Sequence, residues 1–128
     1  MHIHSCGILH NNLKWNNILL EERENRSVNP VIIDFGKACF ALDVKPAVAV
    51  AISKREEHQK RYPHFAPEIL CGSGRQSVTS NIFSFARIAL TVLDLLPTAT
   101  ARSIKMAKLA LNEDPEQRPS LKELLTIL

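Results

Sequence analysis

The chain has 128 residues, of which 45% are hydrophobic and 23% are charged, and its formal net charge is +3. This size and balance predict one folded domain with a real core and exclude a largely disordered chain. The positive charges are scattered and the chain has one Trp and one Tyr, which argues against a nucleic-acid-binding protein.

The cysteines and the longest apolar stretch favour a cytoplasmic protein without a membrane span. Cys6, Cys39 and Cys71 stand at wide, irregular spacings without a CxxC or CxxH pair, so we expect free thiols in a cytoplasmic protein rather than a zinc site. The stretch nearest to a membrane span, residues 81–96, carries two charged side chains and is predicted to be a buried helix instead.

The first third of the chain predicts a β-hairpin. Residues 1–9 are interpreted as the end of a helix. Two apolar runs, residues 18–20 and 31–33, then flank a polar segment, as the two strands of a hairpin do. Such a hairpin would bring Asn17, just before its first strand, close to Asp34, just after its second.

The middle of the chain lacks a clear period. Residues 38–50 are apolar but aperiodic and contain Pro46, whereas residues 53–61 are strongly charged. Together they are predicted to form a long, mobile loop rather than a packed element.

The second half predicts helices. One helix should begin at Ser80 or Asn81 and run to about Leu96, where Pro97 ends it. It is apolar on nearly every side, so we expect protein to surround it. A second helix is predicted over about residues 100–112.

A third helix is predicted at the C-terminus. Ser120 and Glu123 have the spacing of a capping box, in which each side chain satisfies the other residue's free amide. Apolar residues follow at helical spacing, namely Leu121, Leu124, Leu125 and Leu128. The predicted fold class is therefore mainly α with a small β-hairpin.

Three short motifs occur in order along the chain. They are His-Asn-Asn-Leu-Lys-Trp-Asn-Asn at residues 10–17, Asp-Phe-Gly at 34–36 and Ala-Pro-Glu at 66–68. This series resembles the catalytic loop, the metal-binding triplet and the end of the activation segment of eukaryotic protein kinases of the Ser/Thr type. The family's pattern also continues through residues 114–119, Asp-Pro-Glu-Gln-Arg-Pro.

The resemblance implies a partial kinase domain over residues 1–128. It would comprise the C-terminal lobe of a protein-kinase-like fold, with the activation segment at residues 34–68 and the C-terminal helices at 78–128. Nothing in the chain resembles the glycine-rich loop or the strand lysine of the N-terminal lobe, so that lobe is expected to be absent.

The resemblance also implies the cofactors Mg²⁺ and ATP. Asp34 stands at the position of the carboxylate that binds Mg²⁺, and Asn17 at that of the amide oxygen for a second metal ion. Lys14 stands where Ser/Thr-type kinases keep a lysine on the phosphate being transferred. Nucleotide binding by this chain alone is doubtful, because the N-terminal lobe that covers the nucleotide in the family would be missing.

Asn12 is the main departure from the family. It occupies the position of the catalytic Asp, and a carboxamide cannot take the proton of a substrate hydroxyl at neutral pH. Asn11 stands where most members have Arg, and Asn81 replaces an Asp that anchors the catalytic loop in the family. The resemblance therefore implies an impaired active site, with Asn12 and Lys14 as its catalytic-loop residues.

Other family positions are expected to be structural. His10 matches a histidine that packs beneath the metal-binding triplet. Glu68 and Arg118 match a buried ion pair that joins the activation segment to the C-terminal helices, so we expect them to hold the fold together.

Three interpretations are open at this point. The chain is a kinase lobe without activity, which binds or scaffolds a protein partner or is a gene fragment; the missing lobe or another protein would then cover its exposed cleft. Alternatively, it is part of an active protein kinase whose upper lobe precedes a wrongly assigned start at Met1. Finally, an unrelated helical adaptor would match by accident, and it predicts no hairpin before Asp34.

Overall fold

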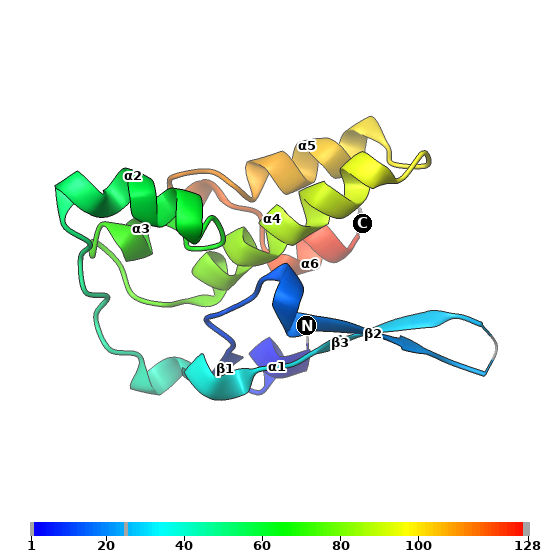
Figure 1. Ribbon diagram of the computed structural model, residues 1–128, viewed down its shortest axis with the longest axis horizontal. Coiled ribbons are helices and arrows are strands. Elements are labelled where there is room, and N and C mark those ends of the chain that lie inside the picture. The colour runs from blue at the N-terminus through cyan, green and yellow to red at the C-terminus, as the bar shows by residue number, and fades with distance from the viewer. Residues whose placement is uncertain (1, 25, 127–128) are drawn as a thin grey trace.

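Helices and two small antiparallel sheets form the computed structural model, which describes residues 2–24 and 26–126. The helices are α1 (His2–Ser5), α2 (Ile52–Arg61), α3 (Pro67–Leu70), α4 (Val78–Leu95), α5 (Ala101–Leu109) and α6 (Leu121–Leu125). The strands are β1 (Ile8–Leu9), β2 (Ile18–Glu22), β3 (Val28–Ile32) and β4 (Cys39–Phe40). In Figure 1, α4 and α5 lie side by side, the β2–β3 hairpin lies below them and projects to the right, and α2 and α3 lie to the left.

The predicted hairpin is confirmed. Strands β2 and β3 pair antiparallel, from Ile18 opposite Ile32 to Glu22 opposite Val28. Both strands are longer than predicted, because polar residues next to the turn also join the ladder. The hairpin contradicts the interpretation as an unrelated helical adaptor, which required none before Asp34.

A second, shorter sheet ties the start of the chain to the segment after the hairpin. The predicted helix end over residues 1–9 is helical only as α1 among its described residues; the chain then turns at Gly7, whose φ of 70° suits glycine, and continues as β1. Strand β1 pairs with β4, with Leu9 opposite Cys39.

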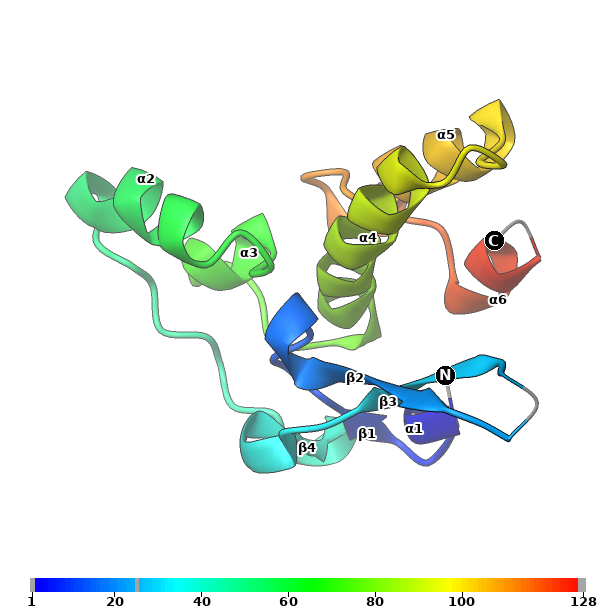
Figure 2. The same ribbon diagram turned by 45° about the vertical axis from the view of Figure 1, so that its right-hand side comes forward.

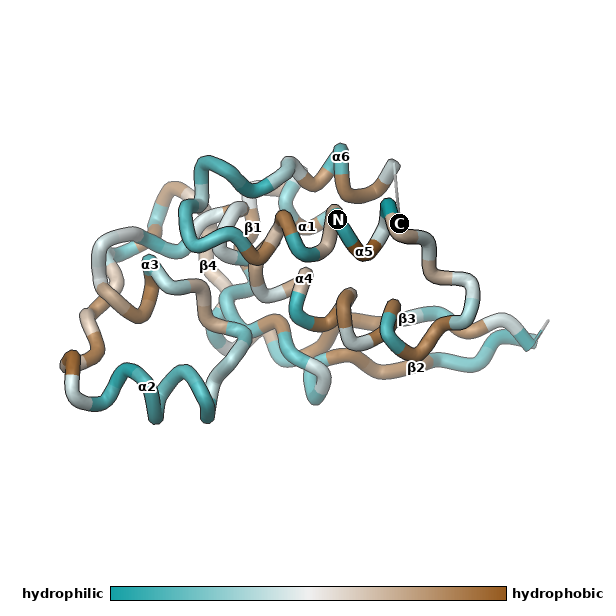
Figure 3. Tube along the Cα trace, turned by 90° about the horizontal axis from the view of Figure 1, so that it is seen from above, coloured by the Kyte–Doolittle hydropathy of each residue, from teal (hydrophilic) through white to brown (hydrophobic). Residues whose placement is uncertain are grey.

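The predicted mobile loop over residues 38–61 is wrong near its start, where Cys39–Phe40 form β4, and in its second half. Residues Ile52–Arg61 form α2, because Lys, Arg, Glu and Gln have high intrinsic helix propensities. Glu56 and Lys60 add an ion pair of 2.8 Å at i, i+4. Figure 3 shows this helix hydrophilic along most of its length, and none of its residues is buried.

Helix α4 begins slightly earlier than predicted. Ser77 caps it, accepting a hydrogen bond from the amide of Ser80, whose own hydroxyl accepts from the amide of Ser77 at 2.9 Å. Ile82 and Ala86 in the first half of α4 form the core with Ala110, at the end of α5, and Leu124 of α6.

The expectation that protein surrounds all of α4 is wrong for its C-terminal end, although Ile88 and Ala89 in its second half are still buried. Leu95 is 76% exposed and Leu96 is 47% exposed. Figure 2 shows this end of α4 diverging from the hairpin. An apolar groove of about 430 Å³ lies between the two elements; its walls include Trp15, Ile18, Leu20, Ile88, Val92 and Leu96. The spacing of apolar residues predicts that α4 has an apolar surface. It does not predict whether another element of this chain packs against that surface.

Helix α4 is also long and apolar enough to cross a membrane, with a mean hydropathy of 1.3 over Val78–Leu95. Core helices meet the same criterion, and 39% of this stretch is buried inside the protein. We therefore assign no membrane span to it.

The C-terminal capping box is confirmed. The amide of Ser120 donates to Glu123 Oε2 at 2.7 Å, and the amide of Glu123 donates to Ser120 Oγ at 3.3 Å. Helix α6 follows, with Leu124 in the core. The predicted end of this helix at Leu128 lies outside the described residues. The mainly helical fold with a small hairpin therefore agrees with the prediction.

Candidate functional site

The loop at residues 10–17 is anchored to α4 by one buried side chain. Asn81 is 1% exposed, and its Oδ1 accepts hydrogen bonds from the amides of His10 at 2.9 Å and Asn11 at 3.1 Å. Its Nδ2 donates to Asn11 Oδ1 at 3.1 Å. Asn11 has a positive φ of 61°, which Asn tolerates better than most residues. The core helix therefore sets the path of this loop.

His10 supports the site from below. It is fully buried, and its ring meets Phe35 edge to face with 4.9 Å between the centroids. The Nε2–H donates to the carbonyl of Ile33 at 3.0 Å, while Nδ1 accepts from the amide of Asn12 at 3.3 Å. These contacts fix the ring in one tautomer and give His10 the structural role expected for it.

Asn12, Asn17 and Asp34 lie together at the base of the hairpin. The amide of Ile33 donates to the carbonyl of Asn17 at 2.9 Å, which aligns the two strand ends. Asn17 Nδ2 donates to the carbonyl of Asn12 at 2.8 Å, and Asn12 Nδ2 donates to Asp34 Oδ2 at 3.2 Å. The predicted proximity of positions 17 and 34 is therefore found in the structure.

The oxygen donors of this cluster are of the kind that Mg²⁺ prefers. Asp34 offers a carboxylate and Asn17 the carbonyl of its amide, both hard oxygen ligands. Asp34 already accepts hydrogen bonds at both oxygens, from Asn12 and from the amide of Gly36 at 3.4 Å. A cation at Asp34 would therefore compete with the amide protons of Asn12. No group of three or more His, Cys, Asp or Glu that could hold a metal ion occurs among the described residues.

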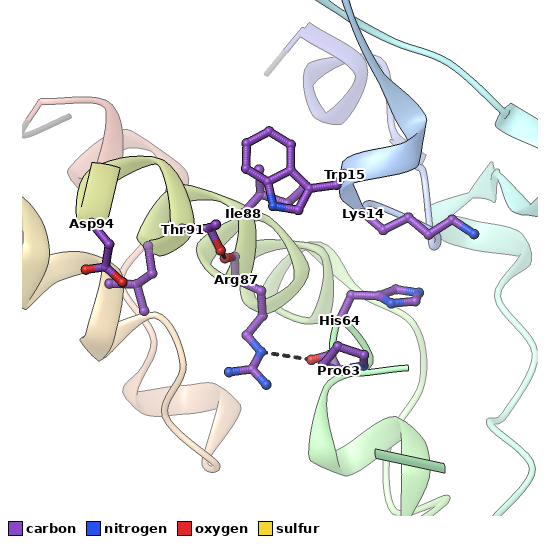
Figure 4. A pocket seen from close by; sticks show the side chains of 9 residues that line it. Lys14, Trp15, Pro63, His64, Arg87, Ile88, Thr91 and Asp94 are labelled. Carbon is purple, nitrogen blue, oxygen red and sulfur yellow. Dashed lines mark hydrogen bonds between the residues drawn. The ribbon is translucent and has the colours of Figure 1, made fainter. Parts of the chain in front are cut away.

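Lys14 belongs to the same loop, where its carbonyl accepts from the amide of Asn17 at 2.9 Å, and it lines a pocket of about 390 Å³. Figure 4 shows Trp15 over one wall of the pocket and Arg87 of α4 on the other, where Arg87 Nε donates to the carbonyl of Pro63 at 3.0 Å. Lys14 and His64 extend in the same direction away from the pocket centre.

The analysis of motifs missed His64 and Lys37. His64 is 7% exposed, and its buried Nε2 has no hydrogen-bond partner among the described residues. Burial, followed by the positive charges of Lys14 and Lys37, lowers the pKa of His64 to about 4. Both missed residues stand next to motifs that were recognised, Lys37 directly after Asp-Phe-Gly and His64 just before Ala-Pro-Glu.

This pKa makes stability depend on pH. The folded protein keeps His64 neutral down to about pH 4, whereas the unfolded chain protonates it near 6.5. The stabilisation is therefore complete above pH 6.5 and lost as the pH falls towards 4, by roughly 2–3 kcal/mol. Urea unfolding of the wild type and of His64→Phe across this range measures it. As the pH falls from 6.5 to 4, the free energy of unfolding should decrease more for the wild type than for His64→Phe. An equal decrease in both proteins would contradict the prediction.

Glu68 and Arg118 form the predicted buried ion pair. The pair is bidentate: Arg118 Nη1 donates to Glu68 Oε1 and Arg118 Nη2 donates to Glu68 Oε2, both at 2.7 Å. Arg118 Nε also donates to the carbonyl of Asn112 at 2.8 Å, and its guanidinium lies 5.0 Å from the centroid of the Phe83 ring. The pair thus joins α3 to α4 and to the segment before α6.

Comparison with known families agrees with the motifs. The family described as "Protein kinase domain" matches residues 1–100. The matched part contains the loop at residues 10–17, Asp34 and Glu68, together with all of α4.

Proposed function

Because the chain belongs to the protein kinase domain family, we propose that it is a kinase-like lobe that binds a protein partner and has lost phosphoryl transfer. It corresponds to the C-terminal lobe of that fold and works in the cytoplasm, consistent with its three free cysteines. The single observation that carries this proposal is the hydrogen bond from Asn12 to Asp34.

This hydrogen bond puts an amide donor where catalysis needs a proton acceptor. Asn12 Nδ2 points its hydrogens at Asp34 Oδ2 over 3.2 Å, and Asn12 is 6% exposed. A carboxamide takes up no proton at neutral pH, and the loss of a general base typically lowers a rate by roughly 10²–10⁴-fold. The same hydrogen bond occupies Oδ2 of Asp34, one of the two oxygens that a cation would bind.

The apolar groove supports a protein as the partner. Leu20 on the hairpin is 69% exposed, and Leu95 and Leu96 at the end of α4 are also exposed. Large exposed apolar surfaces of this kind mark protein–protein contacts more often than contacts with nucleic acids. The partner, or a further lobe of a longer protein, would cover this surface.

Replacing Asn12 tests the proposal. In Asn12→Asp a second carboxylate would face Asp34, so without divalent cations the variant should be less stable than the wild type by roughly 1–3 kcal/mol. Magnesium should then stabilise the variant and leave the wild type nearly unchanged, as measured by urea unfolding in EDTA and in magnesium chloride. Asn16→Asp, on the exposed side of the same loop, is the matched control. Strong stabilisation of the wild type by magnesium would count against the proposal.

A second function is favoured by the arrangement of the other site residues. Asn17 and Asp34 lie close together, and Lys14 belongs to the same loop as Asn17, which suits a lobe that takes part in phosphoryl transfer within a longer protein kinase. Family membership implies that bound Mg²⁺ and ATP would supply the phosphoryl group and neutralise its charge; Asn17 and Asp34 would hold the metal, and Lys14 would contact the phosphate. Phosphorylation of a protein substrate that disappears in Asp34→Ala would support this alternative over the first.

A further inference from the structure

We propose that the outward face of α5 docks on the surface of a membrane that contains anionic lipids. The cations of this face would pair with the lipid headgroups, and Leu95 at the neighbouring end of α4 would enter the lipid layer. This inference goes beyond the proposed function, because it concerns a different surface and needs no protein partner.

Three cations lie on the side of α5 that faces away from the core. Ser103 and Ala107 are the buried residues of this helix. Arg102, Lys105 and Lys108 follow one another at a spacing of three residues, and all three are exposed. This spacing places side chains beside one another on a helix surface. Figures 1 and 2 both show α5 at the edge of the molecule that lies away from the β2–β3 hairpin, so this face is open.

The net charge of the whole chain is concentrated in this part of the protein. Residues 95–112 contain the three cations of α5 and no Asp or Glu. The chain has 16 Lys and Arg residues and 13 Asp and Glu residues, so its excess of three positive charges equals the charge of this stretch. The cations look scattered along the sequence, but the helix collects them on one face.

These cations have no anionic partner within the protein. None of the three forms an ion pair with any residue in the described part of the chain. Of the acidic residues near the two ends of the stretch, Asp94 lines the pocket of about 390 Å³, and Asp114 accepts a hydrogen bond from the amide of Glu116 at 2.9 Å. The positive charge is therefore available to an external anion.

Exposed leucines adjoin the cations. Leu95 is 76% exposed and is not among the residues that line the apolar groove, so an occupant of the groove leaves it free. Leu109, four residues after Lys105 on α5, is 42% exposed. Cations next to exposed aliphatic side chains suit the boundary of a lipid bilayer, because the cations stay with the headgroups while the aliphatic groups leave water.

Other polyanions would use only part of this surface. Residues 95–112 contain no aromatic residue, so the bases of a single-stranded nucleic acid would find no ring on which to stack. A DNA duplex or an acidic polypeptide would neutralise the cations but leave Leu95 in water. The combination of charge and exposed leucine therefore favours a lipid surface.

Co-sedimentation of the whole chain with vesicles tests the inference. One set of vesicles consists of phosphatidylcholine alone, and the other contains about one-third phosphatidylserine. The chain should bind the second set at least about tenfold more tightly, and added salt should weaken this binding. A short DNA duplex and polyglutamate, compared per anionic group, should bind at least about tenfold more weakly than the phosphatidylserine vesicles.

A charge-matched pair of double variants separates the α5 face from general attraction. Lys105→Gln combined with Lys108→Gln should weaken binding to the phosphatidylserine vesicles by at least about tenfold, because each cation near an anionic surface contributes about fivefold. Lys45→Gln combined with Lys54→Gln removes two exposed lysines outside α5 and changes the net charge equally. This control should bind within about twofold of the wild type.

Leu95→Ser tests the apolar contact at constant charge. It should weaken binding to the phosphatidylserine vesicles by at least about fivefold, because the leucine then no longer leaves water. Leu42→Ser is the control, since Leu42 is 98% exposed and lies outside the α4–α5 region. Circular dichroism in urea should show that all these variants fold as the wild type does, because each replaced side chain is exposed.

Several results would overturn the inference. They are equal binding to the two sets of vesicles, no binding to either set, and equal losses in the two lysine double variants. Equal losses in Leu95→Ser and Leu42→Ser, or tighter binding of DNA or polyglutamate than of the phosphatidylserine vesicles, would also overturn it. None of these results bears on the loss of phosphoryl transfer or on a protein partner in the groove, which the magnesium and kinase experiments above test separately.

Discussion

Arg118→Leu should destabilise the protein by roughly 3–5 kcal/mol, because it leaves the carboxylate of Glu68 in a nearly buried position without its partner. The side chain of Arg118 is fully buried and that of Glu68 is only 10% exposed. The variant also loses the hydrogen bonds to the carbonyls of Asn112 and Thr79. The free energy of unfolding in urea, monitored by far-UV circular dichroism, gives the size of the effect.

Two further variants identify the cause. Arg102→Leu removes an exposed arginine of α5 and should change stability by less than about 0.5 kcal/mol. Combining Arg118→Leu with Glu68→Leu should cost less than the sum of the two single changes, because no isolated buried charge is then left. Additive effects would mean that the pair contributes little beyond its separate contacts.

Asn81→Ala should destabilise the protein by roughly 3–4 kcal/mol and loosen the start of the loop at residues 10–17. The substitution removes the acceptor for the amides of His10 and Asn11 and the donor to Asn11 Oδ1 and to the carbonyl of Ser77. Urea unfolding measures the stability. Amide hydrogen exchange at His10 and Asn11, faster in the variant, measures the local effect.

Asn81→Asp separates the two halves of this network. It keeps an oxygen for the amides of His10 and Asn11 but presents no donor to Asn11 Oδ1 or to Ser77, so it should cost roughly 1–3 kcal/mol. Protection of the His10 amide should survive in this variant and be lost in Asn81→Ala. A variant with aspartate that is as stable as the wild type would show that the donor half of the network contributes nothing.

These two anchors explain how a site without a catalytic carboxylate keeps its shape. Asn81 holds the loop to the first half of α4, and Arg118 ties α3 to the same helix through Glu68 and Thr79. Neither Asn81 nor Arg118 is among the residues that line the apolar groove. The proposed function requires such anchors, because it needs the loop and the helices to keep their shape without contacts to a catalytic carboxylate.

Patterns of neighbouring residues were sufficient to predict the hairpin and the C-terminal helix. The hairpin follows from two apolar runs around a polar segment, and its strand ends bring Asn17 and Asp34 together. The capping box of Ser120 and Glu123 also needs only neighbouring residues. The resemblance to kinases added the long-range pair of Glu68 and Arg118, which no local pattern indicates.

Other features could not be read from neighbouring residues. The charged stretch that became α2 has no apolar stripe, so its pattern predicts no packed helix although its residue types favour one. The exposed C-terminal end of α4 is as apolar as a buried helix would be. Distinguishing the two requires knowing which element packs against it.

By itself, the sequence determined the β2–β3 hairpin, the capping box of α6 and the motif positions, because these depend on residues a few places apart. Only the tertiary structure decided that Asn12 donates to Asp34, that His64 is buried without a partner for its Nε2 among the described residues, and that a groove stays uncovered. Each of these depends on distances between segments separated by twenty or more residues, and on which polar groups are left without partners when those segments pack.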